Sequence, residues 1–101
     1  MKNKALNALG LAQRAGKCIT GDELDNAISK NSVALVLVAN DASTRTQSEL
    51  NKQCELKNVS ITDIFNTSEI SQAIGKYNRV AVGIKDNGLA KLIKTYLKDM
   101  R

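Results

Sequence analysis

The sequence contains no proline, no histidine and no tryptophan, and its aromatic residues are two tyrosines and one phenylalanine. The lack of proline argues against polyproline segments and proline-rich linkers. Without histidine, the chain lacks both the most frequent general base of enzymes and the imidazole ligand of many zinc sites. The phosphate-binding patterns G-x-G-x-x-G and G-x-x-x-x-G-K-[ST] are also absent. We therefore expect a protein that is not an enzyme and that has no catalytic residue, metal or cofactor.

Cysteine and long apolar segments are scarce as well. Cys18 and Cys54 lie far apart and form no C-x-x-C pair, so we expect both to be reduced, small core residues. No segment approaches the roughly 18 consecutive apolar residues of a membrane span, and the leucines near the N-terminus are too scattered for a signal peptide. The 101 residues, 43% of them hydrophobic, have the size and composition of one soluble domain, residues 1–101. We expect a cytoplasmic monomer that does not associate with membranes.

Positive charge is concentrated at the two ends of the chain. The overall charge is +5, with +4 in residues 1–17, +5 in residues 76–101 and −4 in residues 18–75. If the two ends lie side by side in the fold, they form one basic surface and leave an acidic surface elsewhere. A basic surface favours a polyanion as partner, with nucleic acid first and an anionic membrane second. A solvated, lysine-rich exterior explains the same charges equally well.

Hydrophobic spacing predicts alternating helices and strands. Apolar residues recur every three or four positions in the amphipathic helices, and residues 33–39 form an unbroken apolar run, typical of a strand covered on both faces. The predicted helices cover residues 2–14, 20–30, 43–57, 66–75 and 86–100, and the predicted strands cover residues 18–19, 33–39, 60–65 and 80–84.

The order of these elements predicts an α/β fold. A helix separates the strands at 33–39 and 60–65, so these two should be parallel. We expect a three-layer α/β/α sandwich around a small mixed, mostly parallel sheet. Loops at the carboxyl ends of neighbouring strands share one edge of such a sheet, where ligands bind. We expect two segments to meet there: the start of the second helix, with Arg14 and Lys17 just before it, and the loop at 76–79.

The start of the second helix is the first candidate site. Thr20 and Glu23 have the spacing of a capping box, in which each side chain accepts a hydrogen bond from the other residue's backbone N–H. Gly21 allows a ligand to approach the backbone closely, and the free N–H groups of a helix start favour phosphate. The acidic cluster of Asp22, Glu23 and Asp25 has the residue types of a metal or acid–base site, but acids at this position more often complement the helix dipole.

The loop of Lys76, Tyr77, Asn78 and Arg79 is the second candidate site. Tyr77 is flanked by basic residues, an arrangement in which the ring stacks on an unpaired base while Lys and Arg hold phosphates. A lone tyrosine in a loop is more often a partly buried structural residue. The loop is therefore supported as a binding site only if it meets the start of the second helix.

Several segments, taken in order, make the chain resemble a known family. It is similar to the kink-turn-binding ribosomal proteins, the family of archaeal large-subunit protein seven-Ae and of protein thirty-e, and most of all to the small bacterial members of that family. The similarity spans nearly the whole chain, which makes it far more specific than any single motif. The segments that carry it are GLAQRAGK (10–17), GDE (21–23), LVLVANDAS (35–43), CE (54–55), NV (58–59), AIGK (73–76) and RVAV (79–82).

The resemblance implies an α/β/α sandwich that binds RNA and associates with the ribosome. In the family, a Gly-x-Asn-Glu-x-x-Lys pattern at the start of the second helix reads the sheared G·A pairs of a kink-turn, and the loop before the last strand packs on a flipped-out nucleotide. By position, Glu23 matches the glutamate, Asp22 falls on the asparagine, Asn26 falls on the lysine, and the glycine is displaced by one to Gly21. Ionised Asp22 cannot donate a hydrogen bond and Asn26 has no charge, so we expect weaker kink-turn affinity or a different preferred RNA.

The prediction assigns a role to each residue of the site. Glu23 accepts from a base edge, Gly21 and Asp22 supply backbone donors, and Tyr77 stacks. Basic side chains contact phosphates, and several compensate for the charge missing at Asn26. The full predicted set is Arg14, Lys17, Gly21, Asp22, Glu23, Asn26, Lys30, Lys76, Tyr77, Asn78 and Arg79.

A different class of function stays open, because the same fold serves protein partners in the wider superfamily. In that alternative the chain is a protein–protein interaction module, and its acidic middle is the working surface. The acidic residues concerned are Glu49, Glu55, Asp63 and Glu69.

Overall fold

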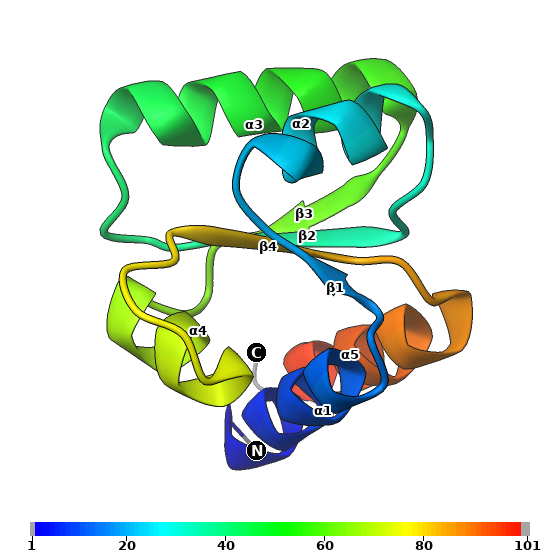
Figure 1. The fold of residues 1–101 in the computed structure, drawn as a ribbon, viewed down its shortest axis with the longest axis vertical. Helices are drawn as coiled ribbons and strands as arrows, with labels where there is room; N and C mark the ends of the chain where they lie inside the picture. Colours follow the sequence, from blue (N-terminus) through cyan, green and yellow to red (C-terminus); the bar gives the residue numbers. More distant parts are fainter. Residues whose placement is uncertain (1, 100–101) are drawn as a thin grey trace.

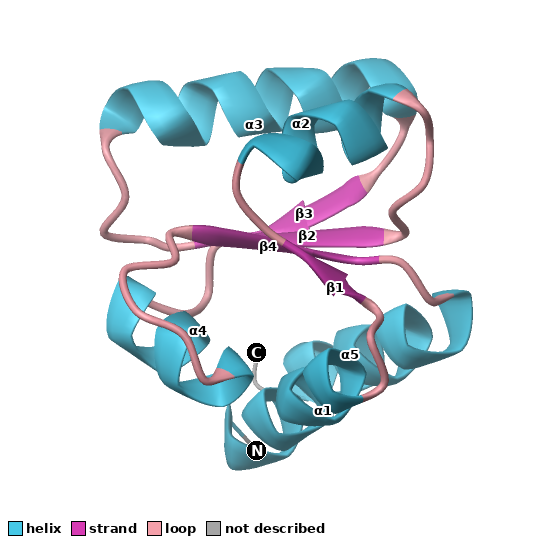
Figure 2. Cartoon of the chain, in the orientation of Figure 1, coloured by secondary structure: helices cyan, strands magenta, loops and turns pink. Residues whose placement is uncertain are grey.

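The computed structural model describes residues 2–99, which form five helices and four strands. Figures 1 and 2 show how these elements build a sandwich of a central sheet between two helical layers. None of the described helices is long and apolar enough to cross a membrane. Met100, the last residue of the helix predicted over 86–100, lies outside the described residues. The elements are α1 (Lys2–Arg14), β1 (Cys18–Ile19), α2 (Asp22–Ser29), β2 (Leu35–Val38), α3 (Thr44–Lys57), β3 (Ser60–Thr62), α4 (Thr67–Ile74), β4 (Ala81–Ile84) and α5 (Asn87–Asp99).

The sheet has the strand order β1-β4-β2-β3 and is mixed, as predicted. β2 and β3 are parallel, whereas β4 is antiparallel to both of its neighbours, β1 and β2. Three strands therefore run in one direction, but the reversed strand lies between two of them, so the expectation of mostly parallel pairing is wrong. The reason is that the chain leaves β3 at one edge of the sheet, passes through α4 and enters β4 at that same edge. The Ala39 N–H, just after β2, donates to the Val80 carbonyl, just before β4, at 2.7 Å.

The central strand β2 is buried on both faces, as its apolar run predicts. Its side chains alternate between two cores, because successive residues of a strand point to opposite faces. Leu35 and Leu37 pack with α1, α4 and α5, and Val36 and Val38 pack with α2 and α3. Figure 1 shows the same division, with α2 and α3 on one face of the sheet and the other three helices on the opposite face.

The first and last helices pack side by side in one layer (Figure 1). Most positive charge thereby lies on that side of the sheet. Residues 20–63, which include α2 and α3, carry four Lys and Arg and seven Asp and Glu, a net −3, whereas the remaining described residues carry ten and three, a net +7. The two ends of the chain therefore lie side by side, which is the condition for one basic and one acidic surface.

A capping box begins α4, whereas the one predicted at the start of α2 is absent. Asn66 accepts from the Glu69 N–H at 2.8 Å, and the Glu69 carboxylate accepts from the Asn66 N–H at 3.0 Å. The capping box at Thr20 and Glu23 was a wrong prediction: α2 begins one residue later, its N-cap is Gly21, and that cap makes no side-chain hydrogen bond. Gly21 has φ 70° and ψ −150°, a conformation that is essentially restricted to glycine. This backbone turn leaves Thr20 outside the N-cap position.

Both cysteines are free thiols, as predicted. Cys54 is buried in the core beneath α3, and Cys18 is half-buried beside α1, where its thiol lies 3.9 Å from the Leu9 carbonyl. Burial raises the pKa of both thiols to about 11. They are therefore protonated at neutral pH and suited to packing.

Candidate nucleic-acid interface

A cleft of about 310 Å³ opens at the edge of the sheet where β1 and β2 end and β4 begins. It brings together the start of α2, the first turns of α3 and the loop before β4. The two candidate segments therefore meet. The loop reaches this edge because β4 runs antiparallel to β1 and β2, so that the residues before β4 lie where those two strands end. The lining residues are Gly21, Leu24, Asp25, Thr46, Glu49, Leu50, Asn78, Arg79, Val80 and Ala81.

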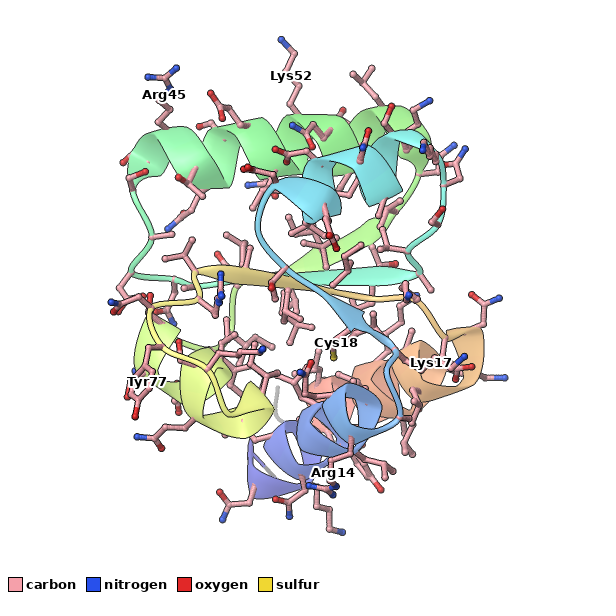
Figure 3. All side chains as sticks on the ribbon, viewed as in Figure 1. Arg14, Lys17, Cys18, Arg45, Lys52 and Tyr77 are labelled. Atoms are coloured by element: carbon pink, nitrogen blue, oxygen red, sulfur yellow. The ribbon has the colours of Figure 1, made fainter. Side chains whose placement is uncertain are left out.

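The loop before β4 is anchored at its end and open at its tip. The buried Ser71 hydroxyl accepts from the Arg79 N–H at 2.9 Å and lies 3.4 Å from the Arg79 carbonyl, to which it donates. Asn78 has a left-handed backbone with φ 52°, which turns the chain between tip and anchor. Tyr77 is 91% exposed and projects from the loop beside α4 (Figure 3). The alternative of a partly buried structural tyrosine is therefore wrong.

The start of α2 presents exposed polar groups next to this cleft. Gly21 has open space where a side chain would otherwise lie. Asp22, Glu23 and Asn26 are all exposed on α2. The N–H groups of Asp22 and Glu23 belong to the first turn, and no side-chain cap accepts from them. Across residues 2–99, no group of three or more acidic or cysteine side chains is arranged to hold a metal ion.

The cleft itself carries charges of both signs. The carboxylates of Asp25 and Glu49 line it together with the Thr46 hydroxyl, and these groups accept hydrogen bonds. Arg79 supplies the opposite charge, and its Nε is buried with no hydrogen-bond partner in the structure. An adjacent ion pair joins Arg45 Nε to Glu49 Oε1 at 3.1 Å. Acceptors and a donor on facing walls fit the edge of a base better than a phosphate, because the carboxylates repel phosphate.

The sequence did not single out Thr46 and Glu49 as residues of this site, and it raised Asp25 only as part of an acidic cluster. Thr46, Glu49 and Leu50 lie at i, i+3 and i+4, a spacing that indicates one face of α3. That spacing does not reveal that this face meets the start of α2. Their place in the cleft follows from the packing of α3 beside α2.

Hydrogen bonds between neighbouring loops hold this edge of the sheet in place. The Gln47 amide donates to the carbonyls of Ala39, Asn40 and Ala42, and so fixes the turn between β2 and α3. Asp41 accepts from the hydroxyl and the N–H of Thr67, which ties that turn to α4. The hydroxyl, and then the N–H, of Thr67 hold the pKa of Asp41 below its usual range. The cleft is therefore built on fixed loops.

Of the five predicted basic residues, Arg79 alone lines the cleft; Lys76 lies in the loop before it, and the other three belong to other parts of the fold. The Lys17 carbonyl accepts from the Lys85 N–H at 2.8 Å, which places Lys17 at the opposite end of β1 from Gly21. Arg14 ends α1, and Figure 3 shows both Arg14 and Lys17 well separated from Tyr77. Lys30 is the C-cap of α2. The expectation that Arg14 and Lys17 flank the start of α2 is wrong, because β1 carries the chain across the sheet between them.

The chain was compared with known families and structures. The family model described as the ribosomal protein L7Ae/L30e/S12e/Gadd45 family matches residues 3–94. The chain belongs to this family. It is 44% identical over 98 residues to a protein named RNA-binding protein YlxQ from Enterococcus faecium, with 96% of this chain and 94% of that protein covered. It is 37% identical over 87 residues to RNA-binding protein YlxQ of Bacillus subtilis (strain 168), with 84% and 87% covered. The predicted likeness to small bacterial members of the family is confirmed.

Solved structures share the fold. A protein of unknown function from Bacillus halodurans superposes with a TM-score of 0.89 at 32% identity, covering 94% of this chain and 97% of that one. The 15.5kD RNA-binding protein of Giardia lamblia superposes with a TM-score of 0.82 at 18% identity, covering 96% and 84%. The predicted α/β/α sandwich is therefore the fold of the family.

Proposed function

We propose that the chain is an RNA-binding protein and that it recognises a kink-turn-like structured RNA through the cleft. The observation that carries the proposal is the exposed ring of Tyr77 on the loop whose next two residues, Asn78 and Arg79, line a cleft of mixed charge at the start of α2. The relatives named RNA-binding protein YlxQ support RNA as the partner.

Each part of the site has a distinct role in this proposal. Tyr77 stacks on an unpaired base, since every base offers an aromatic face. The cleft receives the edge of that base or of its neighbour, with Arg79 donating. Glu23 accepts from a base edge beside the helix start, and the backbone N–H groups of Gly21 and Asp22 hold a phosphate. The exposed Lys76 contacts the backbone without reading sequence.

A titration against two RNAs tests the proposal. The first RNA contains a standard kink-turn, and in the second its G·A pairs are replaced by Watson–Crick pairs. We expect a preference for the kink-turn that persists when salt is raised from about 50 mM to about 200 mM, because base contacts depend less on salt than phosphate contacts. Equal, salt-sensitive binding to both RNAs would contradict kink-turn recognition, and binding to neither would contradict RNA binding.

Two variants separate the roles within the site. Glu23→Ala is expected to weaken the kink-turn complex most, by roughly 1 to 3 kcal/mol, because it removes a base contact. Lys76→Ala is expected to weaken both complexes equally and to reduce the salt slope by about 1. Equal losses on both RNAs from both variants would contradict this division.

The proposal includes association of a monomer with the ribosome. Sucrose-gradient sedimentation of a cell extract is expected to place the protein with ribosomal particles, and nuclease treatment is expected to release it. Sedimentation equilibrium of the purified protein is expected to give the mass of one chain, 10.9 kDa. A dimer mass, or a protein that stays at the top of the gradient, would contradict this part of the proposal.

A second candidate function is a protein–protein interaction through the α2–α3 layer. A groove of about 300 Å³ between these helices carries Leu56, which is 74% exposed, and Gln53, whose Oε1 is buried without a hydrogen-bond partner. Glu49 and Glu55 lie on α3, whereas Glu69 lies in α4 on the other side of the sheet, so the predicted acidic surface is only partly formed. Glu55→Lys is expected to abolish capture of a partner that survives RNase treatment, and unchanged capture would contradict this function.

A further inference from the structure

We propose that the chain has a second nucleic-acid surface, on the opposite helical layer, that binds the phosphate backbone of double-helical RNA. This second surface goes beyond the proposed function, and the proposal rests on that function only in taking RNA as the partner. We call this surface the basic face. It is made by α1, α5 and the two turns that join them to the sheet, and it contains Lys4, Arg14, Lys17, Lys85, Lys91, Lys94 and Lys98.

The cations of the basic face are exposed and unpaired. All seven side chains are exposed, and within residues 2–99 none of the seven makes an ion pair. α1 contains no acidic residue. The acidic residues next to these cations are Asp99, exposed at the end of α5, and Asp86, which accepts from the Leu89 N–H at 2.8 Å as a helix cap. Charge that is left unpaired over one surface raises the local potential and attracts polyanions.

The cations are arranged along two neighbouring helices. Lys91, Lys94 and Lys98 follow one another by three and four residues, which places them on one side of α5 over about 10 Å. Lys94 and Lys98 line a groove beside β3. Lys4 and Arg14 line a second groove, between α1 and α5, where they lie about 15 Å apart along α1. Lys17 and Lys85 lie together at the hydrogen-bonded junction where α1 ends and α5 begins. The result is an extended field of point charges.

This arrangement fits a nucleic-acid backbone better than an acidic protein or a membrane. A double helix presents regularly spaced phosphates over a long surface, and lysine binds them as a point charge with no fixed geometry. A membrane-binding helix needs a broad apolar face opposite its charged one. The exposed apolar residues of the basic face are Leu11 and Leu92, at 46% and 37%.

The test compares two triple variants that remove the same charge from opposite layers. K91Q/K94Q/K98Q changes the basic face, and R45Q/K52Q/K57Q changes α3, where Figure 3 shows Arg45 and Lys52 pointing away from the sheet. Each variant lowers the net charge from +5 to +2. The probe is a plain RNA duplex of roughly 20 base pairs, which lacks a kink-turn. Thermal unfolding followed by circular dichroism checks that each variant is folded.

We expect K91Q/K94Q/K98Q to lose on the order of tenfold in duplex affinity and about 2 in the salt slope, whereas the α3 variant keeps most of both. This outcome supports the basic face even if the kink-turn titration fails. Equal losses in the two triple variants, or no loss in either, would overturn the proposal. Binding of phosphatidylglycerol vesicles that depends on these lysines, with duplex binding unchanged, would overturn it in favour of a membrane partner.

Discussion

The cleft and the basic face differ in the two properties that govern nucleic-acid recognition, shape and charge. The cleft is a defined hollow in which Asp25 and Glu49 offset the charge of Arg79. The basic face offers seven exposed cations along two helices and the turns that join them to the sheet, and no ion pair among the described residues. A hollow with fixed donors and acceptors selects its ligand, whereas a field of cations attracts any phosphate backbone. In our account, this small fold assigns selectivity and general affinity to opposite sides of one sheet.

The largest effect on this comparison is expected from Gly21→Val. Valine at φ 70° and ψ −150° is strained by roughly 1 to 3 kcal/mol, and the start of α2 must move to relieve that strain. We expect a lower melting temperature and loss of kink-turn preference with duplex binding retained. Gly16→Val is the matched control, since Gly16 also has positive φ, 71°, but lies at the end of α1. If Gly16→Val removed the kink-turn preference equally, the preference would not depend on the cleft.

Tyr77→Ala is the next largest change. Loss of one stacking platform is expected to cost about 1 to 3 kcal/mol in kink-turn binding. The unfolding free energy is expected to stay unchanged, because the ring is 91% exposed. Leu56→Ala, at another exposed apolar residue, is the control and is expected to change neither quantity. Parallel titrations and urea unfolding curves give both values, and an effect on stability alone would remove Tyr77 from the site.

Removing the negative charges of the cleft is a third test of how the cleft and the basic face differ. The double variant Asp25→Asn, Glu49→Gln removes the carboxylates that repel phosphate. We expect affinity for the Watson–Crick counterpart of the kink-turn to rise by roughly twofold to fivefold, so that discrimination between the two RNAs falls. The double variant Glu55→Gln, Asp63→Asn, at exposed carboxylates that do not line the cleft, is a control of the same charge change. A gain from this control as large as that from the cleft variant would mean that only net charge matters.

The smallest effect is expected from the two thiols, which lie beneath opposite layers. Their pKa values in the folded protein are raised from 9.0 to about 11, so the unfolded chain ionises first as pH rises. The stability they contribute is present below about pH 9 and is lost towards pH 11. We expect both thiols to react slowly with a disulfide reagent at pH 8, and a denaturant to accelerate the reaction. Rapid reaction of Cys54 in the folded protein would show that α3 opens readily.

The sequence was sufficient to predict most elements and the layers they form. Apolar spacing marked the helices, and the run at 33–39 marked the central strand. The direction of β4 was not predictable in the same way. A helix between two strands usually carries the chain back along the sheet, and nothing local to residues 80–84 indicates that α4 returns it to the same edge.

The site was predictable in its segments but not in its composition. The helix start and the basic loop were identified from local patterns, and the structure brings both to the cleft. Asp25, Thr46 and Glu49 join them only through the packing of α3 on α2, which no single segment encodes. Arg14 and Lys17 are close to Gly21 in sequence and distant in space, because the strand between them spans the sheet. Because these residues are neighbours in the sequence, the prediction placed them on one surface, whereas the fold places Gly21 at the cleft and Arg14 and Lys17 on the basic face.

An NMR titration tests the separation of the two surfaces most directly. The ¹⁵N-labelled protein is titrated first with a kink-turn RNA and then, in a fresh sample, with a plain duplex. We predict that the kink-turn RNA shifts the amides of residues 21–25 and 77–81 as well as those of α5, whereas the duplex shifts α5 and the end of α1 alone. Shifts of the same amides by both RNAs would contradict the assignment of selectivity to the cleft and of general affinity to the basic face.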